Sequence, residues 1–241
     1  MLRLLWIIPG VAAAYILLLC VSALLADPRR KYDKNSRFYR WLLNSATACC
    51  LFIMRIRVKT GGLTKLPEGR FLLVCNHRSN FDPIISWYVL RKYELAFVSK
   101  AENFKIPVFG RLIRRCCFMA IDRENPRRAM AAINRAAGLI ESGEVSVAVY
   151  PEGTRSRSGE LLPFHNGVLK IAQKAGAPVV IATIQGTERI ARNFPLRASY
   201  VKFDILDVIP AGYAAEHRTS ELGADIRQAM LDNIQRGDNI G

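Results

Sequence analysis

The sequence predicts a single α/β domain with a mixed central sheet flanked by helices, preceded by N-terminal membrane-associated helices. Two observations lead to this fold class. An uncharged apolar run occupies residues 4–26, and beyond residue 54 short apolar runs alternate with helical stretches. We therefore expect membrane-anchoring helices over residues 1–54 and one α/β domain over residues 55–241, which is long enough for one sizeable core.

The run from Leu4 to Ala26 predicts a membrane-spanning helix. It contains 23 residues without a charge, and at ~1.5 Å per residue it can cross a hydrocarbon core of ~30 Å. A cleaved signal peptide is the alternative. Only Arg3 precedes the run, its apolar part is too long, and Leu24 fits poorly beside a cleavage site, so we predict one membrane helix.

Basic residues are concentrated directly after this run. The positive-inside rule then places the following domain on the cytoplasmic side of the membrane. The whole chain has 35 basic against 20 acidic residues, a formal net charge of +15. Since the densest basic cluster flanks the membrane run, and no nucleic-acid motif is apparent, the charge indicates anionic lipids as partners and no nucleic acid. The cluster comprises Arg29, Arg30, Lys31, Lys34, Arg37 and Arg40.

A second apolar stretch, Trp41 to Met54, is too short to span a membrane comfortably. It suits a helix that lies in the membrane interface with Trp41 at headgroup depth. A helix packed in the core is the alternative, and the sequence leaves both open.

Beyond residue 54 the sequence predicts strands and helices in alternation. Asp82-Pro83 and Asn125-Pro126 both read as a helix cap followed by proline at the first helical position. Strands are expected at Ile56–Lys59, Phe71–Cys75, Leu95–Val98, Phe118–Ile121, Val145–Val149, Val179–Ile184 and Tyr200–Val208. Helices are expected at Pro83–Leu90, Pro107–Arg115, Pro126–Glu141, Gly167–Ala175 and near Glu221–Gln235.

The loop after the second predicted strand sets His77 beside Asp82. In a continuous helix a spacing of five residues would separate these side chains by about 140° around the axis, so a catalytic pair requires the loop to fold back. An imidazole held by a carboxylate at one nitrogen can take a proton from a substrate hydroxyl at the other. The alternative is that Asp82 only caps its helix and His77 is a polar loop residue.

A second polar loop, Glu152-Gly153-Thr154-Arg155, follows the fifth predicted strand. In open α/β sheets, ligands collect at the carboxyl ends of strands, so the two loops can face one crevice. Arg155 offers a guanidinium group suited to phosphate, Thr154 a hydroxyl donor, and Gly153 a close backbone approach. The alternative is a surface turn with a solvated arginine.

Together these segments resemble the glycerophospholipid acyltransferase family, whose signature is NHxxxxD followed by EGTR. Both motifs are present, and the resemblance covers residues 55–210. The family's second motif is similar to Lys100 through Phe104, Pro107, Phe109-Gly110 and Ile121-Asp122-Arg123, and its fourth to Pro178-Val179-Val180-Ile181.

The resemblance implies transfer of a fatty acyl group from a thioester to the sn-2 hydroxyl of 1-acyl-glycerol 3-phosphate, giving phosphatidic acid. His77 would be the general base and Asp82 would orient it. The substrate-binding residues would be Lys100, Arg123, Glu152, Gly153, Thr154 and Arg155, with phosphate bound by Arg155 and Glu152 holding the loop. No cofactor or metal is expected; acyl-CoA or acyl carrier protein would be the donor, and membrane lipids and lysophosphatidic acid the other partners.

The sequence departs from the family pattern at two points. Tyr150 stands where many members have phenylalanine, and residues 164–167 read Phe-His-Asn-Gly where members often have Phe-Lys-Lys-Gly. Two possible phosphate-binding cations are therefore missing. Glycerol 3-phosphate or another lysophospholipid as acceptor stays open, as does a non-catalytic membrane lipid-binding protein.

The six cysteines include no Cys-x-x-Cys pair and read as reduced, mostly buried residues. Cys75 lies two residues before His77, but it ends an apolar strand whose alternation points it away from its neighbours. A cysteine nucleophile is not expected.

Overall fold

All seven predicted strands form one sheet in the computed structural model, which describes residues 7–122, 124–156 and 158–238. The strand order is β1-β7-β6-β2-β5-β3-β4, and all neighbours run parallel except β6 and β7. The predicted mixed sheet is thus confirmed. The strands are β1 Ile56–Gly61, β2 Leu72–Cys75, β3 Ala96–Lys100, β4 Met119–Ile121, β5 Val147–Val149, β6 Val179–Gln185 and β7 Ser199–Ile209.

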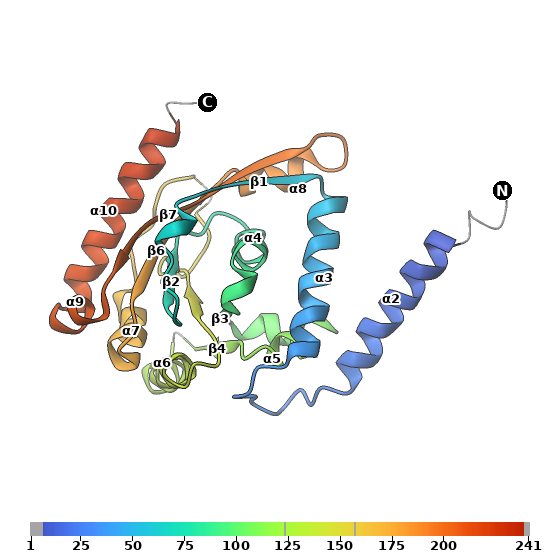
Figure 1. The fold of residues 1–241 in the computed structure, drawn as a ribbon, viewed down its shortest axis with the longest axis horizontal. Helices are drawn as coiled ribbons and strands as arrows, with labels where there is room; N and C mark the ends of the chain where they lie inside the picture. The colour runs from blue at the N-terminus through green and yellow to red at the C-terminus, as the bar shows by residue number, and fades with distance from the viewer. Residues whose placement is uncertain (1–6, 123, 157, 239–241) are drawn as a thin grey trace.

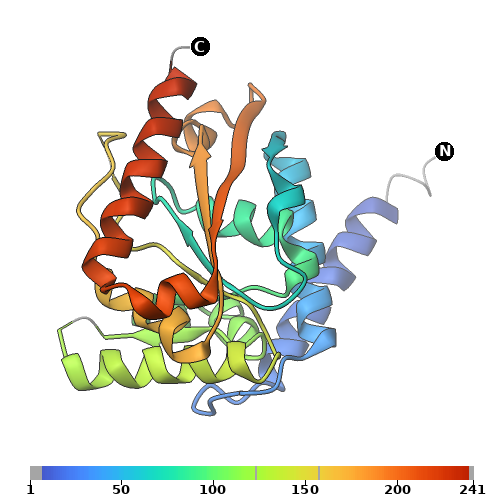
Figure 2. The same ribbon diagram turned by 60° about the vertical axis from the view of Figure 1, so that its left-hand side comes forward.

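Helices cover both faces of the sheet (Figures 1 and 2). Because β2 and β5 are buried along their whole length, they lie at the centre of the core and need a layer on each side. One face carries α3 Arg37–Ile53, α4 Asp82–Val89 and α5 Phe109–Arg114; the other carries α6 Pro126–Glu141, α7 Lys170–Ala175 and α10 Thr219–Asp238. The short helices α8 Ile190–Asn193 and α9 Ala211–Glu216 complete the described chain.

The predicted helix starts have different outcomes. Asn125 caps α6 as predicted, since its side chain accepts a hydrogen bond from the backbone N–H of Arg128. The prediction for Asp82 was wrong: α4 begins at Asp82 itself, Phe81 occupies the cap position, and no side chain caps this helix. The stretch 167–175 is helical, but its first turn, Asn166–Leu169, is a 3-10 helix.

Helix α2, Ile7–Leu24, lies at the edge of the molecule and its N-terminal end points away from the sheet (Figure 1). It has a mean hydropathy of 2.4, only 11% of it is buried, and by length and composition it can cross a membrane. The hydroxyl groups of Tyr15 and Tyr39 join it to α3, by contacts with Ser45 Oγ at 2.7 Å and the Ser22 carbonyl at 2.9 Å.

Helix α3 starts four residues before the predicted stretch, and one of its faces packs on the α/β domain. That face contacts α4, α5 and β1, and it buries Arg40, whose guanidinium donates to the Leu95 carbonyl and stacks 4.6 Å from the Trp87 ring centroid. The opposite face exposes Trp41 and other large apolar side chains. The packed face agrees with the core-helix alternative, and placement of the exposed face in the membrane interface stays a prediction. The exposed residues are Phe38, Trp41, Phe52 and Ile53.

The sheet order places the loops after β2 and β5 side by side, at the carboxyl ends of two neighbouring parallel strands. After β2 the chain crosses to β3 on the far side of β5, whereas after β5 it crosses to β6 on the opposite side of β2. The two connections therefore run in opposite directions over the sheet, with α4 on one face and α7 on the other. Both begin at the same edge of the sheet, the edge at which ligands collect in α/β proteins.

Candidate active site

The loop after β2 folds back and brings His77 and Asp82 together. The imidazole Nδ1 of His77 lies 2.8 Å from Oδ2 of Asp82. The hydrogen bond favours the tautomer with its proton on Nδ1, which leaves Nε2 as a proton acceptor. The geometry required for a catalytic pair is thus present.

Asp82 is fully buried, and hydrogen bonds surround its carboxylate. Besides the imidazole, Oδ2 accepts from the backbone N–H groups of Arg78 at 2.6 Å and Ser79 at 2.7 Å. Oδ1 accepts from the hydroxyl of Thr187. These donors compensate the burial of a negative charge and fix the carboxylate in one orientation.

Sequence reasoning missed Thr187. It is fully buried and follows β6, whose carboxyl end lies beside that of β2. Gly186 permits this turn, because its φ is 88° and a Cβ there would lie 2.4 Å from the Tyr200 carbonyl oxygen. The sequence feature that could have pointed to Thr187 is its position in a Gly-Thr pair directly after a predicted strand.

The ring of His77 packs against Tyr150. Their centroids are 4.5 Å apart and their planes differ by 22°. The Tyr150 hydroxyl lies 3.2 Å from Oγ of Ser86 in α4. The Tyr150 ring is thus fixed by this hydrogen bond and by its stacking on His77. The His77 side chain keeps 18% of its surface exposed, which leaves it accessible to a substrate.

The second polar loop holds the backbone of His77. Its N–H donates to Oε1 of Glu152 at 2.6 Å, and its carbonyl accepts from the N–H of Ser156 at 2.9 Å. The other oxygen of Glu152 accepts from the N–H of Leu162 at 2.9 Å. Burial raises the pKa of Glu152, while the two backbone N–H groups act in the opposite direction.

Asn76 forms a further tie that sequence reasoning did not assign. Its buried amide donates to the Ile184 carbonyl at 3.0 Å and accepts from the Ile184 N–H at 2.8 Å. The start of the loop is thereby joined to β6, so the position of His77 depends on both neighbours of β2.

Four of the remaining predicted site residues, Lys100, Gly153, Thr154 and Arg155, lie at the same edge of the sheet. Lys100 ends β3 and its side chain is exposed. Thr154 and Arg155 are exposed, and Gly153 is buried. The side chains of Lys100 and Arg155 form no ion pair with another described residue. Arg123 lies outside the described residues.

Two cavities adjoin these loops. One of about 340 Å³ is mainly apolar; its lining includes Val98, Val149, Tyr150, Gly153 and Val168. The other, of about 310 Å³, is polar and is lined by three arginines with Ser158, Gly159 and Glu188. The arginines are Arg78, Arg189 and Arg192.

Comparison with known proteins places the chain in one family, the acyltransferases. The family model described as Acyltransferase matches residues 57–185. The 1-acyl-sn-glycerol-3-phosphate acyltransferase of Cocos nucifera is 34% identical over 134 residues, covering 56% of this chain and 43% of that protein. The protein of the same name from Escherichia coli K12 is 28% identical over 166 residues, covering 69% and 67%.

The fold also matches a solved structure. The crystal structure of the LPA acyltransferase PlsC from Thermotoga maritima aligns with a TM-score of 0.69 at 24% identity, covering 83% of this chain and 81% of that one. The chain spans less than two thirds of some relatives, namely 43% of the Cocos protein and 53% of the chloroplastic acyltransferase BAT2 of Brassica napus.

Proposed function

We propose a specific reaction for this chain, which belongs to the acyltransferase family by the match over residues 57–185. The chain transfers a fatty acyl group from a thioester to the sn-2 hydroxyl of 1-acyl-glycerol 3-phosphate. The product is phosphatidic acid. The family match supports the reaction type, and the names of the relatives from Cocos nucifera and Escherichia coli support the acceptor.

The hydrogen bond between His77 and Asp82 is the observation that carries this proposal. Nε2 of His77 removes the proton from the acceptor hydroxyl, and the oxygen attacks the carbonyl carbon of the thioester. Asp82 stabilises the imidazolium that forms. The C–O bond forms as the C–S bond breaks, and the proton passes to the departing thiolate.

The substrate supplies the nucleophile, so the reaction requires no acyl-enzyme. Cys75, the nearest cysteine in the chain, is buried, and its burial raises the pKa of the thiol well above its usual value. Its thiol is therefore protonated at neutral pH and unsuited to attack. The donor is an acyl thioester of coenzyme A or of acyl carrier protein.

The phosphate of the acceptor is assigned to Arg155, with Lys100 and Arg123 as further cations. The exposure of Arg155 and Lys100 at the edge where His77 lies supports this assignment. The cavity with Arg78, Arg189 and Arg192 offers a second position for the same phosphate. Comparison of Arg155→Ala with Arg189→Ala separates the two, because only the variant at the true site raises KM for the phosphorylated acceptor.

The enzyme acts at a membrane surface in this proposal. Helix α2 provides an apolar segment long enough to cross a bilayer, and α3, which is joined to α2 by hydrogen bonds of Tyr15 and Tyr39, exposes large apolar side chains. The basic residues after α2 favour the cytoplasmic side for the catalytic domain. The apolar cavity beside Tyr150 can receive part of an acyl chain.

The test is thiol release from acyl-CoA and from acyl carrier protein thioester by the detergent-solubilised protein, with three acceptors compared. We expect release that depends on lysophosphatidic acid, with phosphatidic acid as the product. If turnover is faster with glycerol 3-phosphate, or with a lysophospholipid of another headgroup, than with lysophosphatidic acid, that compound is the acceptor instead. The absence of thiol release with all three acceptors would contradict the proposed reaction.

A further inference from the structure

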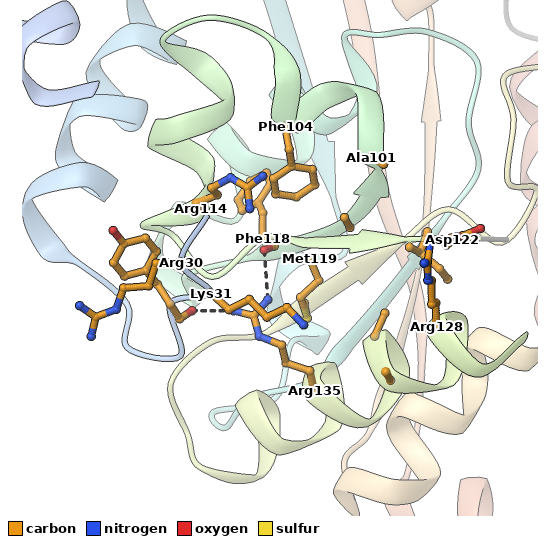
Figure 3. Close-up of a pocket in the computed structure, with 15 residues that line it drawn as sticks. Arg30, Lys31, Ala101, Phe104, Arg114, Phe118, Met119, Asp122, Arg128 and Arg135 are labelled. Atoms are coloured by element: carbon orange, nitrogen blue, oxygen red, sulfur yellow. Dashed lines mark hydrogen bonds and ion pairs between the residues drawn. The ribbon is translucent and has the colours of Figure 1, made fainter. Parts of the chain in front are cut away.

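A cavity of about 400 Å³ lies along the outer edge of the sheet, and of its lining residues only Ile121 also lines the apolar cavity beside Tyr150 (Figure 3). Strand β4 is the last strand of the sheet, so among the described residues no strand pairs with its other edge. Phe104 and Arg114 form one wall of the cavity, α6 forms the opposite wall, and residues 30–32 close one end.

The segment that follows α2 is fixed against the domain at this cavity. The Tyr32 hydroxyl accepts a hydrogen bond from the Asp27 N–H at 3.0 Å, and the Arg115 guanidinium lies 4.5 Å from the Tyr32 ring centroid. Arg135 of α6 donates to the Tyr32 carbonyl and to Asp33, both at 2.7 Å. Residues 30 and 31 are thus positioned at the cavity by packing on either side.

The cavity has an excess of positive charge. Two of its cations are paired, since Arg128 lies 3.3 Å from Asp122 and Arg135 lies 2.7 Å from Asp33. The other three have no carboxylate partner within the described ranges. These three are Arg30, Lys31 and Arg114.

Arg114 is the cation whose hydrogen-bonding groups are not all satisfied within the described residues. Its Nε is buried and has no hydrogen-bond partner among the described residues, and its guanidinium stacks 4.9 Å from the Phe104 ring centroid. Burial lowers the pKa of Arg114, and the nearby charge of Arg135 adds to this effect. A partly desolvated guanidinium without a carboxylate partner binds strongly to an anion that supplies both charge and acceptor oxygens.

The remaining lining is apolar. Phe104, Phe118 and Met119 form the floor, and Ala131 and Ala132 of α6 form one side. The occupant therefore combines an anionic group with hydrocarbon. Since α2 packs on α5 and the cavity wall continues from the end of α2, a membrane-inserted α2 places this cavity beside the lipid headgroups.

We propose that this cavity binds the phosphate of an anionic membrane phospholipid, such as phosphatidylglycerol, that is neither substrate nor product. Arg114 and Lys31 contact the phosphate, and the first carbons of the acyl chains lie on Phe104 and Phe118. The inference rests on the membrane association in the proposed function. Lipid binding would hold the segment after α2 against α5 and α6, and so orient the catalytic domain on the bilayer.

Ala131 provides a matched test, because it is exposed on α6 and lines the cavity. Ala131→Glu introduces a carboxylate among the cations, whereas Ala131→Gln introduces a neutral side chain of the same size. Both residues form helices well, so the fold is retained. A second pair compares Arg114→Gln in the cavity with Arg29→Gln outside it.

The full-length protein in neutral detergent is titrated with dihexanoyl phosphatidylglycerol, dihexanoyl phosphatidylcholine and glycerol 1-phosphate, and binding is measured by calorimetry. We expect the wild type to prefer phosphatidylglycerol over phosphatidylcholine. Affinity for phosphatidylglycerol should fall by about tenfold or more in Ala131→Glu relative to Ala131→Gln, and in Arg114→Gln relative to Arg29→Gln.

Equal affinities within both pairs, or equal binding of the two lipids, would overturn the proposal. Glycerol 1-phosphate binding as tightly as phosphatidylglycerol would assign the cavity to a free phosphate and overturn the lipid. Acyl transfer and recovery in the membrane fraction are measured separately on the wild type. Lipid discrimination without acyl transfer would then contradict the proposed reaction, and leave the lipid site standing.

Discussion

The carboxylate of Glu152 accepts a hydrogen bond from the backbone N–H of His77 at 2.6 Å. The N–H of Ser156, four residues further along the same loop, donates to the His77 carbonyl. One motif loop therefore holds the backbone of the residue on which the other motif depends. Both oxygens of Glu152 are occupied by backbone donors, which fits a positioning role and leaves neither for substrate.

Glu152→Gln should lower kcat by about 10²-fold with KM changed only a few-fold, because a small displacement of a reacting group has an effect of this size. The glutamine amide must place an N–H group against a backbone N–H, of either His77 or Leu162. Steady-state kinetics checks this, with Glu160→Gln, an exposed side chain in the same loop, as the control. An unchanged kcat would show that the loop does not position His77.

Tyr150→Phe should keep kcat within about fivefold of wild type, because it removes only one weak hydrogen bond, to Ser86, and keeps the stacked ring. Tyr150→Ala should lose the stack on His77 and destabilise the fold by about 3–5 kcal/mol. Kinetics and thermal unfolding of both variants distinguish ring from hydroxyl. A large loss of kcat in Tyr150→Phe would assign the hydroxyl to the reaction.

Arg155→Ala should raise KM for lysophosphatidic acid more than KM for the thioester, by at least about tenfold for loss of a charged contact. The reason is that only the acceptor carries the phosphate assigned to Arg155. Separate saturation curves for the two substrates provide the measurement. Equal rises in both KM values would remove Arg155 from phosphate recognition.

Thiol reactivity should separate the cysteines by burial. Burial raises the pKa of Cys75 well above its usual value, that of Cys116 to about 12 and that of Cys117 to about 11. A raised thiol pKa means that the reactive thiolate forms only at higher pH. In the native protein a thiol reagent at pH 8 should therefore modify the exposed Cys49 and leave these three unmodified until the protein unfolds.

The matching substitution is Cys75→Ala, which should retain most of the turnover. Modification of Cys75 in the folded protein, together with loss of turnover in Cys75→Ala, would reopen a cysteine mechanism.

The strands could be predicted from the sequence because each is a short apolar run bounded by polar or turn residues. Helix α6 could be predicted to its ends, since an Asn-Pro cap and helical periodicity coincide there. The start of α3 could not, because Arg40 is polar in sequence but buried against Trp87 in the fold. Helices α8 and α9 span four and six residues, too few for a periodic signal.

Part of the candidate site could be predicted from the sequence, and part could not. His77 and Asp82 could be proposed as a pair from residue type and the resemblance of their motif, but their contact depends on a loop whose conformation no periodicity encodes. The tie from Thr187 to Asp82 joins residues 105 positions apart. Such a contact follows from the order of β2 and β6 in the sheet, which the sequence pattern does not determine.

The central claim is that Nε2 of His77 takes the proton from the acceptor hydroxyl. The most direct measurement is kcat for lysophosphatidic acid acylation by His77→Ala, beside wild type and His217→Ala, a histidine held by Tyr213 away from the site. We predict a loss of at least about 10²- to 10⁴-fold in His77→Ala, with phosphatidic acid formation unchanged in His217→Ala. Near-normal turnover by a folded His77→Ala would contradict the account.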